Sequence, residues 1–219
     1  MTTSTTVHVM RHGQVYNPDG LLYGRLPGFG LSELGHRMAE RMASHFADAP
    51  LTHLRCSPLQ RARETMVPSA AKHPELDVVI DDRLIEAENK FEGKVFGANN
   101  RALFDPRMMW HVRNPLRPSW GEPYVDIAAR MLAAIGDAAE AAGDGGTALV
   151  VSHQLPIYIA RRAVEGKPFP HDPRRRRTTL CSVTSFRFVD GRVVRVDYGE
   201  HIPDLLPEST SATKFRVGT

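Results

Sequence analysis

Two short apolar runs that each end in a histidine constrain the fold of this chain more than any other feature. The first run covers residues 7–11 and leads into His12-Gly13, and the second covers residues 148–152 and leads into His153. Apolar runs of this length predict buried strands. Gly13 is the first residue after the opening strand at which we expect the chain to turn freely. If the two strands are parallel, both histidines lie at the carboxyl edge of one sheet, where ligands bind in open α/β folds.

A helical pattern follows the first of these strands. Leu34, Met38, Met42 and Phe46 recur every four residues and share one helical face. Ser32 lies just before them and has the character of an N-cap. We therefore expect an amphipathic helix that begins at Ser32.

A second helix is expected to open at Ser57-Pro58, with the serine as a cap and the proline at the first helical position. We expect this helix to run through Thr65 and to end at Pro68. Two further strands are expected at residues 51–56 and 78–80, and the second of them is expected to be short and buried. Helices are expected at about 122–142 and from near Pro156 to about Gly166. The last expected element is a hairpin of residues 182–189 and 192–198. The hairpin turns about Asp190-Gly191, which is typical of a type I′ turn.

Strands that alternate with helices before a late hairpin predict an α/β fold. We expect three layers, with a mainly parallel central sheet and helices on both of its faces. A length of 219 residues suits a single domain over residues 1–219. Residues 90–121 lose clear periodicity and are interpreted as a cap-like insertion over one end of the sheet. The larger side chains of this insertion either have a packing and surface role or determine substrate specificity. They are Arg101, Arg107, Arg113, Arg117, Trp110 and Trp120.

Composition and spacing narrow the class of protein. Cys56 and Cys181 form no disulfide framework, and the histidines show no metal-ligand spacing, so we expect no metal and no cofactor. The net charge of +3 is a mild bias. Arg174–Arg177 is a basic run without interleaved aromatic residues, which is more typical of a solvated loop than of a nucleic-acid site. With no secretory signal and no run of transmembrane length, a cytoplasmic protein without membrane contact is expected.

The polar residues that follow the predicted strands have complementary chemistry. Arg11 and His12 follow the first strand, Arg61 lies shortly after the second, and His153 follows a later one. Arginine guanidinium groups match the oxygens of a phosphate, and an imidazole acts as a nucleophile or a donor. A nearby carboxyl group could protonate a departing oxygen. Together these residues predict a pocket for a tetrahedral dianion.

Four blocks of the sequence resemble, in their order and spacing, those of the histidine phosphatase (phosphoglycerate mutase-like) superfamily. They are Val9-Met10-Arg11-His12-Gly13, Ser57-Pro58-Leu59-Gln60-Arg61-Ala62-Arg63-Glu64-Thr65, Leu84-Ile85-Glu86 and Val151-Ser152-His153, with Phe91-Glu92-Gly93 and Gly121-Glu122 as secondary blocks. The resemblance spans roughly residues 7–200.

The resemblance implies a role for each of five residues. His12 is expected to be the nucleophile that forms a phosphohistidine. Arg11, Arg61 and His153 are expected to bind the phosphate and to stabilise its non-bridging oxygens in the transition state. Glu86 is expected to donate a proton to the leaving group.

Other positions depart from the family pattern or lie beside its signature residues. Asn17 falls one residue early for a phosphate contact, and Gln154 stands where glycine is usual, so that its side chain could enter or extend the phosphate pocket. Gln14 replaces the usual glutamate after Arg-His-Gly. Glu88 is a rival to the acid, but a solvated loop carboxylate is the preferred interpretation. Arg63 is interpreted as a helix-surface charge.

The sequence thus favours a phosphomonoester hydrolase of the metal-independent histidine acid phosphatase type, acting through a phosphohistidine on a small phosphorylated metabolite. The alternative is a cofactor-dependent phosphoglycerate mutase, although the mutase-type Glu-Arg-His-Tyr-Gly block is absent. A non-catalytic module that binds a phosphorylated ligand is a third hypothesis. The natural substrate is not determined by the sequence, and a homodimer is left open.

Overall fold

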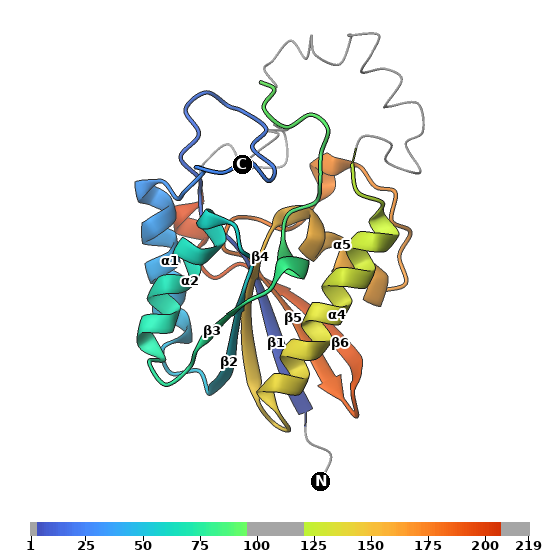
Figure 1. Ribbon diagram of the computed structural model, residues 1–219. Helices are drawn as coiled ribbons and strands as arrows, with labels where there is room; N and C mark the ends of the chain where they lie inside the picture. Colours follow the sequence, from blue (N-terminus) through green and yellow to red (C-terminus); the bar gives the residue numbers. More distant parts are fainter. Residues whose placement is uncertain (1–3, 96–120, 207–219) are drawn as a thin grey trace.

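The computed structural model describes residues 4–95 and 121–206, which form a six-stranded sheet between two layers of helices (Figure 1). The strands lie in the order β3-β2-β4-β1-β5-β6. Their bounds are β1 (Ser4–Arg11), β2 (Leu51–Cys56), β3 (Val78–Ile80), β4 (Thr147–Ser152), β5 (Val183–Val189) and β6 (Arg192–Gly199). Strands β1 to β4 are mutually parallel, whereas β5 is antiparallel to β1 and β6 is antiparallel to β5. The predicted mainly parallel sheet is confirmed.

Helices cover both faces of this sheet. Helices α1 (Glu33–Phe46) and α2 (Gln60–Lys72) pack on one face, and α4 (Tyr124–Ala142) and α5 (Gln154–Val164) pack on the other (Figure 1). Short 3-10 turns occur at η1 (Asp82–Leu84), η3 (Pro173–Arg175) and η4 (Pro203–Leu205). The three-layer α/β architecture predicted from the sequence is confirmed. None of the helices in these two ranges is both long and apolar enough to span a membrane.

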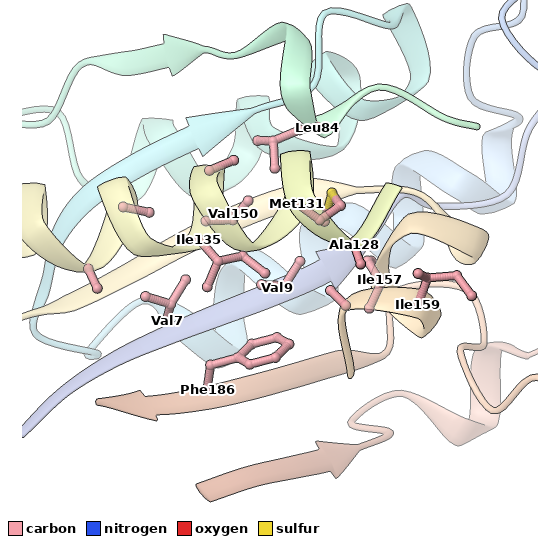
Figure 2. Close-up of a cluster of buried hydrophobic side chains, with 14 of the residues drawn as sticks. Val7, Val9, Leu84, Ala128, Met131, Ile135, Val150, Ile157, Ile159 and Phe186 are labelled. Atoms are coloured by element: carbon pink, nitrogen blue, oxygen red, sulfur yellow. The ribbon is translucent and has the colours of Figure 1, made fainter. Parts of the chain in front are cut away.

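Strand β1 supplies both layers of the core because successive side chains of a strand point to opposite faces. Val7 and Val9 pack toward α4 and α5, together with Val150 of β4 (Figure 2). Met10 points to the other face and packs among the residues of α1 and α2. Burying a side chain of this size contributes about 1.5–3 kcal/mol. A slip of one residue would exchange the two faces, so packing fixes the register that positions the strand ends.

Helix α1 follows the predicted pattern closely. The Oγ of Ser32 accepts a hydrogen bond of 3.0 Å from the backbone N of Gly35, as an N-cap does. Met38 and Met42 are fully buried, and Phe46 is nearly so. The predicted helix and its cap are confirmed.

The prediction for α2 was wrong at both ends. The helix begins at Gln60 rather than at Pro58, with Leu59 as its N-cap, and it continues through Pro68 to Lys72. Pro68 removes one helical hydrogen bond, but Met66 and Ser69 on either side of it are buried. Tertiary packing of this face therefore stabilises the helix beyond Pro68, where local propensity favours the end of the helix.

Strand β3 is present at the predicted residues, but it is not buried. In the described part of the chain it pairs only with β2, at the edge of the sheet, and Val79 and Ile80 are 40% and 47% exposed. The hairpin turn is as predicted, since Asp190 and Gly191 have φ values of 49° and 72°. Most of the cap predicted at residues 90–121 lies outside the described residues.

Candidate active site

The two strand-end histidines meet at one edge of the sheet. Strands β1 and β4 are neighbours, with Arg11 paired to Ser152, so the next residue of each strand emerges at the same level. The backbone N of His12 donates to the carbonyl of Ser152 over 3.1 Å, which extends the ladder by one step. The ring centroids of His12 and His153 lie 5.1 Å apart. The sheet therefore brings together the residues that the sequence placed at its carboxyl edge.

His12 is held as a neutral imidazole with a defined tautomer. Its ring is almost completely buried, and its Nδ1 lies 2.8 Å from the carbonyl oxygen of Gly13. A carbonyl only accepts, so Nδ1 carries the hydrogen and Nε2 carries the lone pair. The Nε of Arg61 donates to that Nε2 over 3.3 Å. Burial, followed by the charges of Arg61 and Arg11, holds the pKa of His12 well below its usual value.

Gly13 is required for space, which differs from the role expected from the sequence. Its φ is not in the left-handed region. A Cβ at Gly13 would lie 2.7 Å from the carbonyl oxygen of Gly35 in α1. Its backbone N donates to the Oγ1 of Thr65 in α2 over 3.0 Å. The glycine lets the end of β1 fit closely between the two helices, and this contact positions His12.

The two arginines beside His12 are buried and tethered by backbone carbonyls. Arg11 and Arg61 are 4% and 1% exposed. The Nη1 of Arg11 donates to the carbonyl of Thr178 and the Nη2 of Arg61 donates to that of Gly24, each over 2.8 Å. The Cζ of Arg61 also lies 4.7 Å from the centre of the Tyr23 ring. Burial lowers the pKa of both guanidinium groups, but arginine remains protonated, so two positive charges are concentrated here.

His153 is the N-cap of α5 and is completely buried. Its Nε2 lies 2.7 Å from the Oγ of Ser57, whereas its Nδ1 has no hydrogen-bond partner among the described residues. Burial, then the charges of Arg61 and His12, lower its pKa well below the usual value. Ser57 was expected to cap a helix. It instead fixes the ring of His153, a role that local sequence does not reveal.

The predicted acid, Glu86, follows the turn η1 and is partly buried. Its Oε1 accepts a hydrogen bond of 2.8 Å from the backbone N of Ala87, and its carbonyl accepts one of 2.7 Å from the Nε of Arg25. Its charge acts on both Arg11 and Arg61, where it opposes the larger effect of burial on their pKa values. The rival carboxylate, Glu88, is exposed.

A salt-bridge brace supports the segment that carries Glu86. Glu122 binds Arg25 over 3.0 Å and Arg130 over 2.7 Å. Arg130 also donates to the carbonyl of Ile85 over 2.7 Å. The brace thus joins the loop before α1, the start of α4 and the Glu86 segment. The secondary block Gly121-Glu122 was the only sequence signal for it.

The remaining predicted residues have simpler surroundings. Both polar atoms of the Asn17 side chain bind the backbone of Leu21, at 2.8 and 3.0 Å, which closes the loop between them. Its phosphate contact stays a prediction. Gln154 is the first residue of α5 and is partly buried beside His153, and Arg63 is exposed on α2. Sequence reasoning missed Tyr23, because its segment shows only loop chemistry.

In the described part of the chain, no cluster of three or more His, Cys, Asp or Glu side chains could hold a metal ion.

A mainly parallel sheet with this set of strand-end residues is typical of a phosphoglycerate mutase-like α/β protein. The chain belongs to the histidine phosphatase superfamily (branch 1), whose family model matches residues 7–201.

Relatives and solved structures agree with this assignment. Protein Rv0525 of Mycobacterium tuberculosis, whose function is uncharacterized, is 50% identical over 200 residues, which cover 91% of this chain and 98% of the relative. The mycobacterial glucosyl-3-phosphoglycerate phosphatase Rv2419c has the same fold, with a TM-score of 0.70 and 24% identity over 89% of this chain and 97% of that one. A phosphoglycerate mutase from Bacillus anthracis is also similar, with a TM-score of 0.65 and 21% identity over 91% of this chain and 92% of that one. The superfamily fold thus accommodates both phosphatases and mutases.

Proposed function

We propose that the protein is a phosphomonoester hydrolase that acts on a small phosphorylated metabolite through a phosphohistidine at His12. The observation that carries this proposal is the buried His12 ring, whose Nε2 accepts a hydrogen bond of 3.3 Å from the Nε of Arg61 and whose pKa is held well below its usual value by burial. A nucleophile must be unprotonated, and a phosphate must be met by positive charge. The Nε2 of His12 supports both requirements, because it carries a lone pair and lies beside the positive charge of Arg61.

In the first step, Nε2 of His12 attacks phosphorus, and the bond between phosphorus and the ester oxygen breaks. Glu86 gives its proton to the leaving oxygen, so that an alcohol departs. In the second step, water attacks the phosphohistidine, its proton passes to the Glu86 carboxylate, and the bond between nitrogen and phosphorus breaks. Inorganic phosphate leaves, and His12 and Glu86 are restored.

The non-bridging oxygens are stabilised by the surrounding cations. Arg11 and Arg61 hold two permanent positive charges in a buried setting, where each hydrogen bond to a phosphate oxygen is strengthened. The unpartnered Nδ1 of His153 supplies a further polar atom for the phosphate, as a donor when it carries the proton. This positive field supplies what a divalent ion provides in other phosphatases.

Mutase activity is the second candidate, because the fold is shared with a phosphoglycerate mutase. Hydrolysis is preferred, since the mutase-type Glu-Arg-His-Tyr-Gly block does not occur in the sequence. Supplying 3-phosphoglycerate with its bisphosphate cofactor and measuring both products separates the two. Isomerisation that outpaces phosphate release would establish the mutase.

The central test combines turnover with trapping of the phosphoenzyme. His12→Ala should lose nearly all release of phosphate from para-nitrophenyl phosphate, and brief incubation of the wild type with labelled substrate should give acid-labile, base-stable protein phosphate. His36, an exposed histidine of α1, gives the matched control His36→Ala. Chelators should leave the wild-type rate unchanged, and vanadate should inhibit. Near-normal turnover by His12→Ala would falsify the assignment, and absence of any turnover would leave the non-catalytic module.

A further inference from the structure

The position of Arg11 depends on a segment of chain that takes no part in the proposed reaction. The Nη1 of Arg11 donates to the carbonyl of Thr178 over 2.8 Å, and its backbone N donates to the carbonyl of Ser182 over 3.1 Å. Both carbonyls belong to residues 178–182, which lead into β5. A displacement of this segment would therefore move the guanidinium of Arg11.

Core packing fixes one end of this segment. Residues 179–182 form a tight turn, in which the backbone N of Ser182 donates to the carbonyl of Thr179 over 3.1 Å. Cys181 has a φ of 54°, a left-handed value that costs a residue with a side chain about 1–2 kcal/mol. Its side chain is completely buried in the same core cluster as Met10 and Val183. Because a strained residue persists only where its surroundings determine it, packing holds the Cys181 end of the segment.

The other end of the segment is held by Tyr198 of β6, which contacts the residues on both sides of Thr178. The Oη of Tyr198 accepts a hydrogen bond of 3.3 Å from the backbone N of Thr179. The Cζ of Arg177 lies 5.6 Å from the centre of the Tyr198 ring, within the range of a cation–π contact. Strand β6 lies at the edge of the sheet, where Tyr198 pairs with Thr184 of β5 (Figure 1). The ring and the hydroxyl of Tyr198 thus tie the segment to the sheet.

Glu200 determines how the Tyr198 hydroxyl is used. The Oη of Tyr198 donates to the Oε1 of Glu200 over 2.6 Å, and the Oγ1 of Thr179 donates to the same oxygen over 3.1 Å. A lone pair of the phenol oxygen then remains to accept the Thr179 N–H. Burial, followed by the hydrogen bond to Glu200, raises the pKa of Tyr198, so the phenol keeps its proton in the neutral range. Each of these three donors therefore has an acceptor.

We propose that Tyr198 is a positioning residue for Arg11, because it holds residues 177–179 where the carbonyl of Thr178 directs the guanidinium toward the phosphate site. The proposal rests on the hydrolase function for the role of Arg11 in binding phosphate. In this scheme Tyr198 touches no reacting atom and acts through Thr178. The position of the guanidinium can be observed without any substrate.

The test removes single groups from this cluster. Tyr198→Phe keeps the aromatic ring and deletes the hydroxyl. Tyr158→Phe is its matched control, because the Tyr158 hydroxyl takes part in a hydrogen bond with an arginine of its own helix, α5. Glu200→Ala removes the acceptor that orients the phenol, and Asp197→Ala, which removes an exposed carboxylate of β6, is the control for that change.

Three quantities are measured for the wild type and each variant. The first is the NMR resonance of the Arg11 Nε, assigned with Arg11→Lys in the protein without ligand. The second is the dissociation constant of inorganic phosphate, measured by calorimetry. The third is the pair of constants kcat and KM for para-nitrophenyl phosphate.

Tyr198→Phe should shift the Arg11 resonance and weaken phosphate binding about threefold to tenfold, as the loss of one hydrogen bond does. Glu200→Ala should change both quantities in the same direction, and the two controls should change neither. An unchanged Arg11 resonance or an unchanged phosphate affinity in Tyr198→Phe overturns the proposal, since the cluster would then serve stability alone. Should Tyr198→Phe fail to fold, Glu200→Ala decides by the same criteria.

Failure of the hydrolase function gives a different result. A wild type that binds phosphate and shows these changes, but releases no phosphate from esters, refutes only the hydrolase function. A wild type that binds no phosphate also removes that function. The Arg11 resonance then decides by itself whether Tyr198 positions the guanidinium.

Discussion

The Nε of Arg61 and the Nε2 of His12 face each other across 3.3 Å, with the arginine as donor. The lone pair that accepts this hydrogen bond is the one that would attack phosphorus. The two interactions therefore exclude each other. In the proposed reaction, the Arg61 N–H would turn from the nitrogen to an oxygen of the phosphate as phosphoryl transfer begins. This exchange would couple exposure of the nucleophile to the arrival of the anion.

The state of the His12 ring can be observed directly by nitrogen NMR. Its pKa is held well below the usual value, first by burial and then by Arg61 and Arg11. The ring should therefore remain neutral at about pH 6, with the hydrogen on Nδ1. Long-range proton–nitrogen spectra recorded across the neutral range, assigned with His12→Ala, give both results. A ring that becomes cationic near its ordinary pKa would contradict this assignment.

Ser57 should act through His153. Ser57→Ala leaves the buried Nε2 of His153 without its partner, which is 2.7 Å away in the wild type. We expect kcat/KM to fall about tenfold, as for an unsatisfied buried polar group, and the His153 ring nitrogens to shift. Ser44→Ala, on the exposed side of α1, is the control. Reduced turnover without any change in the His153 spectrum would show that Ser57 has another role.

Glu86 should matter most for poor leaving groups. An alkoxide needs a proton to leave, whereas nitrophenolate leaves unaided, and general acid catalysis is typically worth about a hundred- to ten-thousandfold. Glu86→Gln should thus slow an alkyl phosphate far more than para-nitrophenyl phosphate. The exposed Glu88 provides the matched variant Glu88→Gln. Equal slowing of both substrates by Glu86→Gln would remove it from this role, and selective slowing by Glu88→Gln would transfer the role there.

Stability should decrease in acid because buried histidines resist protonation. Burial, together with His201 and His45, lowers the pKa of His8 to about 4, and burial lowers that of His171 to about 4. Below the ordinary histidine pKa the unfolded chain therefore binds more protons than the folded protein, and the free energy of unfolding falls until the pH reaches about 4.

Urea unfolding at about pH 7.5 and about pH 5 measures this difference. His8→Gln should reduce the difference between the two conditions, and the exposed His36→Gln should not. An unfolding free energy that does not change between these conditions would refute the prediction.

Much of the fold could be predicted because it depends on local patterns. The alternation around Val7 and Val9 defines a strand with two buried faces, and the four-residue spacing from Leu34 to Phe46 defines α1. The exposure of Val79 and Ile80 could not be predicted in this way. It depends on the order of strands in the sheet, which places β3 at an edge.

The candidate site likewise contains residues that the sequence predicts and residues that it does not predict. His12 and His153 were predictable because each follows a strand, and parallel strands share an edge. The groups that hold them come from distant segments: Ser57 contacts His153 across 96 positions and Thr178 contacts Arg11 across 167. The basic run around Arg176 was interpreted as a solvated loop, but Arg176 is partly buried and its Nε donates to the Nε2 of His171 over 2.8 Å, whereas the neighbouring Arg175 is exposed.

The crowding of Arg11 and Arg61 has a consequence for the energetics of the whole protein. Two like charges are buried together, and the charge of Arg61 lowers the pKa of Arg11. An anion that binds between them relieves this repulsion only in the folded chain, since Arg11 ends β1 and Arg61 begins α2. By thermodynamic linkage, ligand binding and folding then reinforce each other. If phosphate binds as proposed, the free energy of unfolding should therefore rise with the phosphate concentration.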